Sequence, residues 1–236
     1  MNLLILTHSY PESGNKFRGI FIQEQARILS TVHKVIVVYF KVDYSSLKPF
    51  SPYTYSFEEE QNYILYKVVT RRSLPVINQV KYLKDTYLFL SKVVLANYQI
   101  DLVHSHLVYP AGFLGTMISR KNSIPHVLTE HTSIRKYYRS YLHKLCVRYT
   151  IIHSQKIVSV SNSLKNEIYS EFKRDIEVIH NVVDTSKFFI KEKPLNDKIN
   201  IGFLGSMNDQ NKGLDLLLQA IASINNDKIV LHIGGK

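Results

Sequence analysis

The stretch DLVHSHLVYPAGFLGTMISRK, residues 101–121, decides which fold the 236-residue chain is expected to adopt. It starts with an apolar run at residues 102–104 and ends with a helix-like segment at residues 110–121. A short run that is apolar on consecutive positions is expected for a strand covered on both faces. The stretch therefore predicts a buried strand followed directly by a helix.

The same pattern recurs from one end of the chain to the other. Further strands are expected at residues 2–7, 34–41, 63–69, 126–129, 157–160, 176–179, 199–204 and 228–233, and further helices at residues 17–30, 77–97, 135–153, 161–172 and 212–224. Strands that alternate with helices predict an α/β fold with a parallel sheet and right-handed crossovers. Residues 43–62 are polar and contain two prolines, so they are predicted to form a surface excursion.

A change of composition divides the chain. Residues 184–198 are rich in lysine and weakly periodic, which predicts a linker between a domain at residues 1–183 and a second domain that starts at residue 199. Residues 199–236 hold one strand-helix-strand unit, which cannot bury both faces of its sheet. We therefore expect the second domain to be truncated.

Composition limits the classes of partner. The formal net charge is +11, which suits nucleic acid, an anionic membrane surface or a phosphorylated small molecule, although abundant lysine alone explains part of it. The basic residues are spread over both halves and no nucleic-acid-binding motif is present, so we expect no nucleic-acid partner. A single cysteine and the lack of an apolar run of eighteen residues predict a cytoplasmic protein.

Ionisable residues and glycines follow several of the predicted strands. In the first domain these are Gly19, the pair His104 and His106, and the pair Glu130 and His131. Ligands bind at the carboxyl ends of strands in such sheets, and helix N-termini favour anions. His131 could orient an acceptor hydroxyl with Glu130 holding its ring, but structural histidines and a buried pair are equally open explanations. Two histidines without a third ligand predict no metal site.

The second domain opens with a glycine turn. Gly205 ends its first strand, and Lys212 stands at the start of its helix. A lysine at that position is suited to neutralise a diphosphate. The spacing is not that of a Walker A loop.

A basic aromatic segment occupies residues 135–149. Taken as one helix, it places Leu142, Leu145, Cys146 and Tyr149 on one stripe and its arginines and lysines elsewhere. This pattern predicts either contact with anionic lipid headgroups or a solvated face over a core stripe.

Six segments occur in order along nearly the whole chain: residues 19–26, 101–112, 129–132, 158–161, 178–184 and 212–213. This ordered set resembles the retaining GT-B glycosyltransferases of glycosyltransferase family 4. The resemblance implies two Rossmann-like domains, of which the first binds the acceptor and the second a nucleotide-diphosphate sugar, with no metal and no other cofactor.

The resemblance also implies roles for individual residues. His131 corresponds to the histidine near the transferred sugar, and His104, His106 and Glu130 lie on the acceptor side. Gly19, Gly205 and Lys212 correspond to groups around the donor diphosphate. The expected acceptor is a lipid-linked or polysaccharide molecule at the inner face of a bacterial membrane, in the synthesis of surface polysaccharide.

Two features depart from the family pattern. An arginine that usually precedes the lysine is absent at or near Ser206, and the glutamates that bind the donor would lie beyond residue 236. The 236-residue chain is therefore not expected to transfer sugar by itself. The alternatives are a GT-B nucleotide-sugar epimerase and a basic binding module without catalysis.

Overall fold

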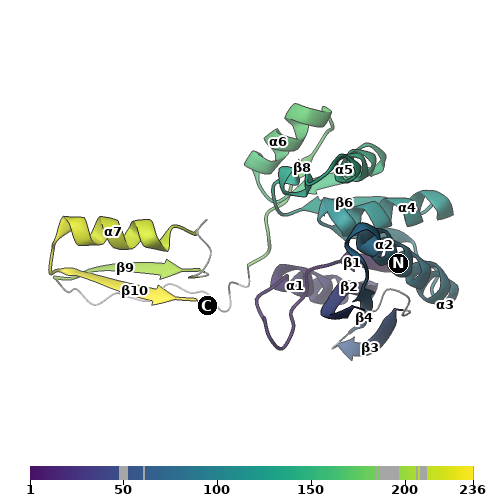
Figure 1. Cartoon of the computed structure of the whole chain (residues 1–236), viewed down its shortest axis with the longest axis horizontal. Coiled ribbons are helices and arrows are strands. Elements are labelled where there is room, and N and C mark those ends of the chain that lie inside the picture. The colour runs from purple at the N-terminus through teal and green to yellow at the C-terminus, as the bar shows by residue number, and fades with distance from the viewer. Residues whose placement is uncertain are drawn as a thin grey trace. The chain divides into compact units, whose positions relative to one another are not determined.

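The computed structural model describes residues 1–47, 53–60, 62–183, 185, 197–205, 207 and 212–235. The chain divides into two compact units, Met1–Val183 and Asp184–Lys236 (Figure 1). Most of the predicted linker lies outside the described residues.

The first unit contains an eight-stranded sheet with the order β3-β4-β2-β1-β5-β6-β7-β8. Every neighbouring pair is parallel except β3 and β4, which are antiparallel. The strands are β1 (Asn2–Thr7), β2 (Lys34–Leu47), β3 (Thr54–Glu60), β4 (Tyr63–Arg72), β5 (Leu102–His106), β6 (His126–Glu130), β7 (Lys156–Ser159) and β8 (Glu177–Val178). The α/β fold with a parallel Rossmann-like sheet is thus confirmed.

Helices connect the strands and cover both faces of the sheet (Figure 1). They are α1 (Ile20–Leu29), α2 (Pro75–Phe89), η1 (Leu90–Val94), α3 (Leu95–Asn97), η2 (Val108–Gly112), α4 (Phe113–Asn122), η3 (Ile134–Tyr137), α5 (Tyr141–His153) and α6 (Asn162–Phe172). Alternate residues of β1 show why both faces are buried: Leu3 and Ile5 pack in one cluster with Ile22 of α1. Leu4 and Leu6 pack in another with residues of η1 and α4.

The strand order reverses at β1, which lies between β2 and β5. Such a switch point opens a crevice at the carboxyl ends of the strands, because the connections leave in opposite directions. The segments that follow β1 and β5 therefore border the place where this fold binds ligands.

Two expectations about the elements need correction. The described part of residues 43–62 lies at the surface as expected, but it contains the end of β2 and the edge strand β3, whose residues are almost all exposed. The supposed helix at residues 135–153 is two elements, η3 and α5, because the chain turns out of the helix and Ser140 caps α5 by accepting from the His143 amide.

The apolar stripe predicted for that helix is wrong for Leu142 and Leu145 but right for the buried Cys146, and Tyr149 is half-buried. Leu142 and Leu145 are 58% and 44% exposed, whereas Cys146, Val147 and Ile151 form the buried side of α5. The capping role expected of Ser161 is confirmed, since its hydroxyl accepts from the Leu164 amide at the start of α6.

The second unit consists of β9 (Ile199–Leu204), α7 (Leu214–Ile224) and β10 (Ile229–Gly234). The two strands are parallel neighbours, and α7 connects them. Among the described residues of the whole chain, no helix has the length and apolar character needed to cross a membrane.

Candidate functional site

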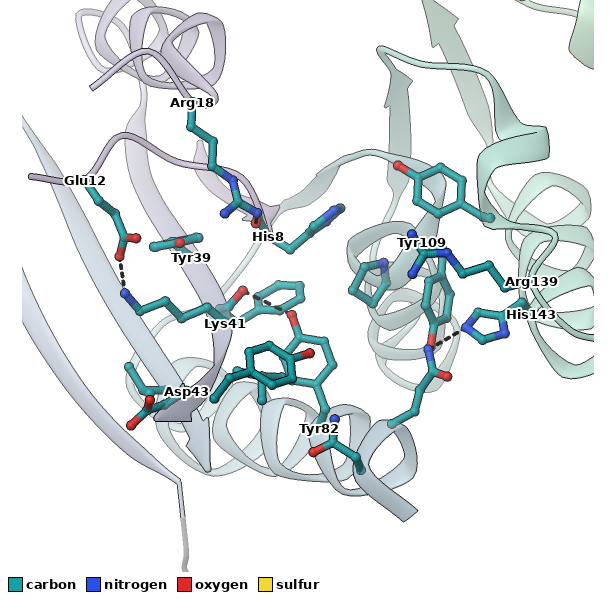
Figure 2. A pocket seen from close by; sticks show the side chains of 18 residues that line it. His8, Glu12, Arg18, Tyr39, Lys41, Asp43, Tyr82, Tyr109, Arg139 and His143 are labelled. Atoms are coloured by element: carbon teal, nitrogen blue, oxygen red, sulfur yellow. Dashed lines mark hydrogen bonds and ion pairs between the residues drawn. The ribbon is translucent and has the colours of Figure 1, made fainter. Parts of the chain in front are cut away.

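A large pocket lies at the carboxyl edge of the sheet in the first unit (Figure 2). Its volume is about 970 Å³, at the upper end of the range for small-molecule sites. It is built from six segments: the loop after β1, the middle of β2, Val69 of β4, the first turns of α2, the start of η2 and the η3–α5 turn. The lining residues are His8, Glu12, Arg18, Tyr39, Phe40, Lys41, Val42, Asp43, Tyr44, Val69, Asn78, Gln79, Tyr82, Tyr109, Pro110, Tyr137, Arg139 and His143.

Tyrosines form much of the wall of this pocket. The Tyr82 hydroxyl donates to the Phe40 carbonyl over 3.1 Å. The Gln79 amide nitrogen lies 2.5 Å from the Tyr109 hydroxyl and 2.6 Å from Nε2 of His143. These bonds fix the aromatic rings, and burial raises the pKa of Tyr39 to about 12, so its hydroxyl stays protonated at neutral pH. The pocket therefore offers rigid aromatic faces together with hydroxyl donors.

Sequence patterns did not reveal this pocket as a unit, because its residues come from six separate segments without a shared motif. None of the predicted site residues lines it. The available signal was weak: His8 follows β1, and the part of β2 that lies level with and beyond the end of β1 carries Tyr39, Lys41, Asp43 and Tyr44.

A smaller pocket of about 160 Å³ holds two of the predicted residues, His104 and His131. Nε2 of His104 lies 2.8 Å from the Thr129 hydroxyl, and Nε2 of His131 lies 2.9 Å from Nδ1 of His106. The His131 ring also packs on Phe21 of α1, with ring centres 4.3 Å apart. The structure thus brings the three histidines together, although His106 is fully buried and lines neither pocket.

Burial keeps these histidines neutral. It lowers the pKa of His104 and that of His131 to about 4, and it lowers the pKa of His106 well below its ordinary value. A neutral His131 can accept a hydrogen bond or a proton, which a protonated ring cannot.

Glu130 does not hold the His131 ring, so that interpretation is wrong. Its carboxylate accepts from three main-chain amides: Val108 at 2.6 Å, and His131 and Thr132 at 2.9 Å each. Burial raises the pKa of Glu130 to about 7, against the effect of these donors. Glu130 therefore connects η2 to the end of β6. The His131 ring is instead held by His106, in the place predicted for Glu130.

Gly19 caps α1 in a left-handed conformation, with φ of 66°. A Cβ atom there would lie 2.3 Å from the Ser9 carbonyl oxygen, so only glycine fits. The neighbouring Arg18 donates to the His8 carbonyl over 3.1 Å. Gly19 thus brings the start of α1 against the loop after β1 and places Phe21 on His131.

In the second unit, Gly205 and Lys212 are close together. The Lys212 Cγ would lie 3.6 Å from a Cβ atom on Gly205, and the Gly205 amide donates to the Gly234 carbonyl over 3.0 Å. Gly213, with φ of 67°, caps α7 directly after Lys212. Ser206, where the family arginine is absent, lies outside the described residues.

Within the described ranges, no three His, Cys, Asp or Glu side chains are arranged to hold a metal ion. A reaction without metal or other cofactor stays a prediction.

Comparisons with known proteins show the fold and the family of this chain. The fold is that of GT-B proteins: the chain superimposes with a TM-score of 0.63 on Anabaena Alr3699/HepE, solved with UDP and glucose. That match covers 99% of this chain and 60% of the other at 15% identity. A candidate UDP-N-acetylglucosamine 2-epimerase of Listeria monocytogenes shares the fold with a TM-score of 0.53 at 12% identity, covering 100% of this chain and 62% of the other.

The chain belongs to Glycosyltransferase Family 4, whose model matches residues 19–187. An uncharacterized glycosyltransferase of Methanocaldococcus jannaschii is 33% identical over 175 residues, which are 72% of this chain. The chain spans 46% of that relative's length. The family resemblance seen in the sequence is thereby confirmed.

Proposed function

We propose that this chain forms the acceptor-side part of a glycosyltransferase that moves a sugar, with retention, from a nucleotide-diphosphate sugar to a lipid-linked or saccharide acceptor. The observation that carries the proposal is the large tyrosine-lined pocket at the carboxyl edge of a family 4 domain. Hydroxyl donors and aromatic faces suit a sugar, which has polar edges and an apolar face.

His131 is proposed to accept from the attacking hydroxyl of the acceptor. Its ring is neutral, and His106 and Phe21 fix its orientation. Lys212 is proposed to neutralise the leaving diphosphate, and Gly205, in the same unit, to let main-chain groups approach the phosphates. The donor-side role of Gly19 stays a prediction. Under this proposal, stabilisation of charge on the leaving group provides most of the catalysis.

The test uses the whole protein with a nucleotide sugar and a panel of acceptors. Tyr44 lines the pocket and is 63% exposed, so Tyr44→Ala removes a contact without opening the core. The acceptor KM is expected to rise roughly 10-fold with the donor KM unchanged, while Lys212→Gln raises the donor KM. Tyr169→Ala, at a 51% exposed tyrosine of α6, is the matched control. An unchanged acceptor KM in Tyr44→Ala would reject the large pocket as the acceptor site.

The epimerase alternative keeps support from the shared fold alone. It predicts epimerised nucleotide sugar in reactions that contain no acceptor. Transfer of the sugar to an acceptor, with no epimerised nucleotide sugar formed, would support the glycosyltransferase and reject the epimerase.

We place the reaction at the inner face of the plasma membrane, in surface polysaccharide synthesis. Support comes from α5, where the exposed apolar side chains Tyr141, Leu142 and Leu145 lie among the exposed Lys144 and Arg148. Apolar side chains with basic neighbours suit an anionic lipid surface, and each basic residue contributes about 1 kcal/mol.

Liposome sedimentation tests this contact. Leu142→Ser with Leu145→Ser, and separately Lys144→Gln with Arg148→Gln, are expected to weaken binding to anionic vesicles. Neutral vesicles and the pair Lys156→Gln with Lys165→Gln are the controls. Equal binding by all variants would reject the membrane contact.

A further inference from the structure

Charge in the large pocket is not balanced. Glu12 forms an ion pair with Lys41, and Asp43 forms one with Arg71, which lies outside the pocket lining. Each acidic side chain of the lining is therefore already compensated. Two guanidinium groups, those of Arg18 and Arg139, have no carboxylate partner among the described residues.

The two arginines approach the pocket from separate segments. Figure 2 shows Arg18, from the loop before α1, on one side of the cavity and Arg139, from the turn before α5, on the other. Arg18 uses one nitrogen to donate to the His8 carbonyl, which holds its head group over the cavity and leaves its other donors open.

The pKa values of His8 and His143, the histidines beside these arginines, are both lowered. Burial is the main reason that the pKa of His8 falls to about 4 and that the pKa of His143 is lowered, and the positive charges of Arg18 and Arg139 respectively add to it. Both rings are therefore neutral at pH 7 and add no positive charge. Nε2 of His143 accepts from the Gln79 amide, and its Nδ1 lies 2.7 Å from the Ser140 hydroxyl. The pocket thus combines two permanent cations with neutral rings.

We propose that the acceptor bound in this pocket carries a phosphate or diphosphate group, which Arg18 and Arg139 hold while the tyrosines contact the adjoining sugar. This inference rests on the proposed function and names the chemical class of its acceptor. Guanidinium groups bind phosphate oxygens through paired N–H donors, and two of them balance a group of charge about −2.

Isothermal titration of the 236-residue chain tests the proposal with matched probes. Glucose 1-phosphate and methyl α-glucoside differ in the phosphate group, and inorganic phosphate and pyrophosphate separate a phosphate monoester from a diphosphate. We expect glucose 1-phosphate or pyrophosphate to bind at least 10-fold more tightly than methyl α-glucoside, with an affinity that falls as salt rises.

Variants locate the site. Arg18→Gln and Arg139→Gln are each expected to weaken binding of the phosphorylated probe roughly 10- to 100-fold, because each removes a charge-assisted pair of hydrogen bonds. Arg135→Gln, at an exposed arginine of η3 outside the pocket lining, should bind as the wild type does. Circular dichroism melting confirms that each variant is folded. In NMR titrations, the bound phosphate should raise the pKa of His8 and His143.

Several results would overturn the proposal. Equal affinity for both glucose probes, both weakened by Tyr44→Ala, would leave a saccharide site as the proposed function requires but reject the phosphate group. Binding of no probe would reject it as well. UDP that competes with glucose 1-phosphate and loses affinity in Arg139→Gln would assign the arginines to the donor instead of the acceptor.

Discussion

At the scale of single residues, Glu130 shows how a predicted site residue can serve the architecture instead of the chemistry. Its two carboxylate oxygens accept from three amides across the η2 and β6 connections, and its side chain is fully buried. An unpaired buried amide costs about 1–3 kcal/mol, so these bonds stabilise the loops that border both pockets.

The change Glu130→Gln tests that role. The amide nitrogen of glutamine would face the Val108 amide, donor against donor, and we expect the free energy of unfolding to fall by about 1–3 kcal/mol. Urea denaturation measures it. Glu177→Gln, which breaks an exposed ion pair with Lys156, should cost less than about 1 kcal/mol. An equal loss of unfolding free energy in Glu130→Gln and Glu177→Gln would contradict the structural role of Glu130.

His131 is the residue whose chemistry depends most on its surroundings. In the whole protein, His131→Ala is expected to lower kcat at least about 100-fold, because it removes the neutral acceptor for the attacking hydroxyl. His131→Asn keeps a hydrogen-bond acceptor and should recover part of that loss. Steady-state kinetics with donor and acceptor near saturation measure both. If His131→Ala kept a kcat within a factor of a few of the wild-type value, His131 would not be the acceptor for the attacking hydroxyl.

At the scale of elements, the approach of α4 to β5 is set by a glycine. A Cβ atom on Gly115 would lie 2.0 Å from the Ser105 hydroxyl oxygen and 2.9 Å from Nε2 of His126. Those two side-chain atoms are hydrogen-bonded to each other over 2.9 Å in the interior. Helix α4 can therefore pack this closely on β5 only because Gly115 has no side chain.

Gly115→Ala is expected to destabilise the first unit by about 1–3 kcal/mol, since the added methyl group displaces the Ser105–His126 pair. Alanine in a helix would otherwise stabilise by up to about 1 kcal/mol, so the contact decides the sign. Gly14→Ala, with nothing within 4 Å of the new Cβ, is the control. Thermal melts compare the two, and a stabilised Gly115→Ala would contradict the expected clash.

At the scale of the whole molecule, buried histidines govern the response to acid. Burial lowers the pKa values of His8, His104, His106, His126 and His131 below the ordinary 6.5, to about 3 for His126 and about 4 for His8, His104 and His131. Between pH 6.5 and about 4 the unfolded chain binds more protons at these sites, so stability falls as pH falls. Glu130 acts in the opposite direction, because its pKa is raised to about 7, but it is one group against five.

We therefore expect a lower urea midpoint at pH 5 than at pH 7. Far-UV circular dichroism is the measurement of choice, since the chain contains no tryptophan. Replacing one of these residues, as in His126→Gln, should reduce the slope by at most about 1.4 kcal/mol per pH unit in this window. Stability that stays level from pH 7 to pH 5 would show that the histidines titrate normally.

The sequence alone predicted the parallel α/β fold, the positions of its buried strands along the chain and the placement of His104, His106 and His131 at strand ends. Strands covered on both faces appear as apolar runs, and residues at the carboxyl ends of adjacent parallel strands must lie near each other. The packed structure was needed for the strand order, the contact between His106 and His131, the edge strand β3, the exposure of Leu142 and Leu145, and the large pocket. An exposed edge strand has no burial pattern, and a pocket formed by six separate segments exists only once those segments are packed side by side.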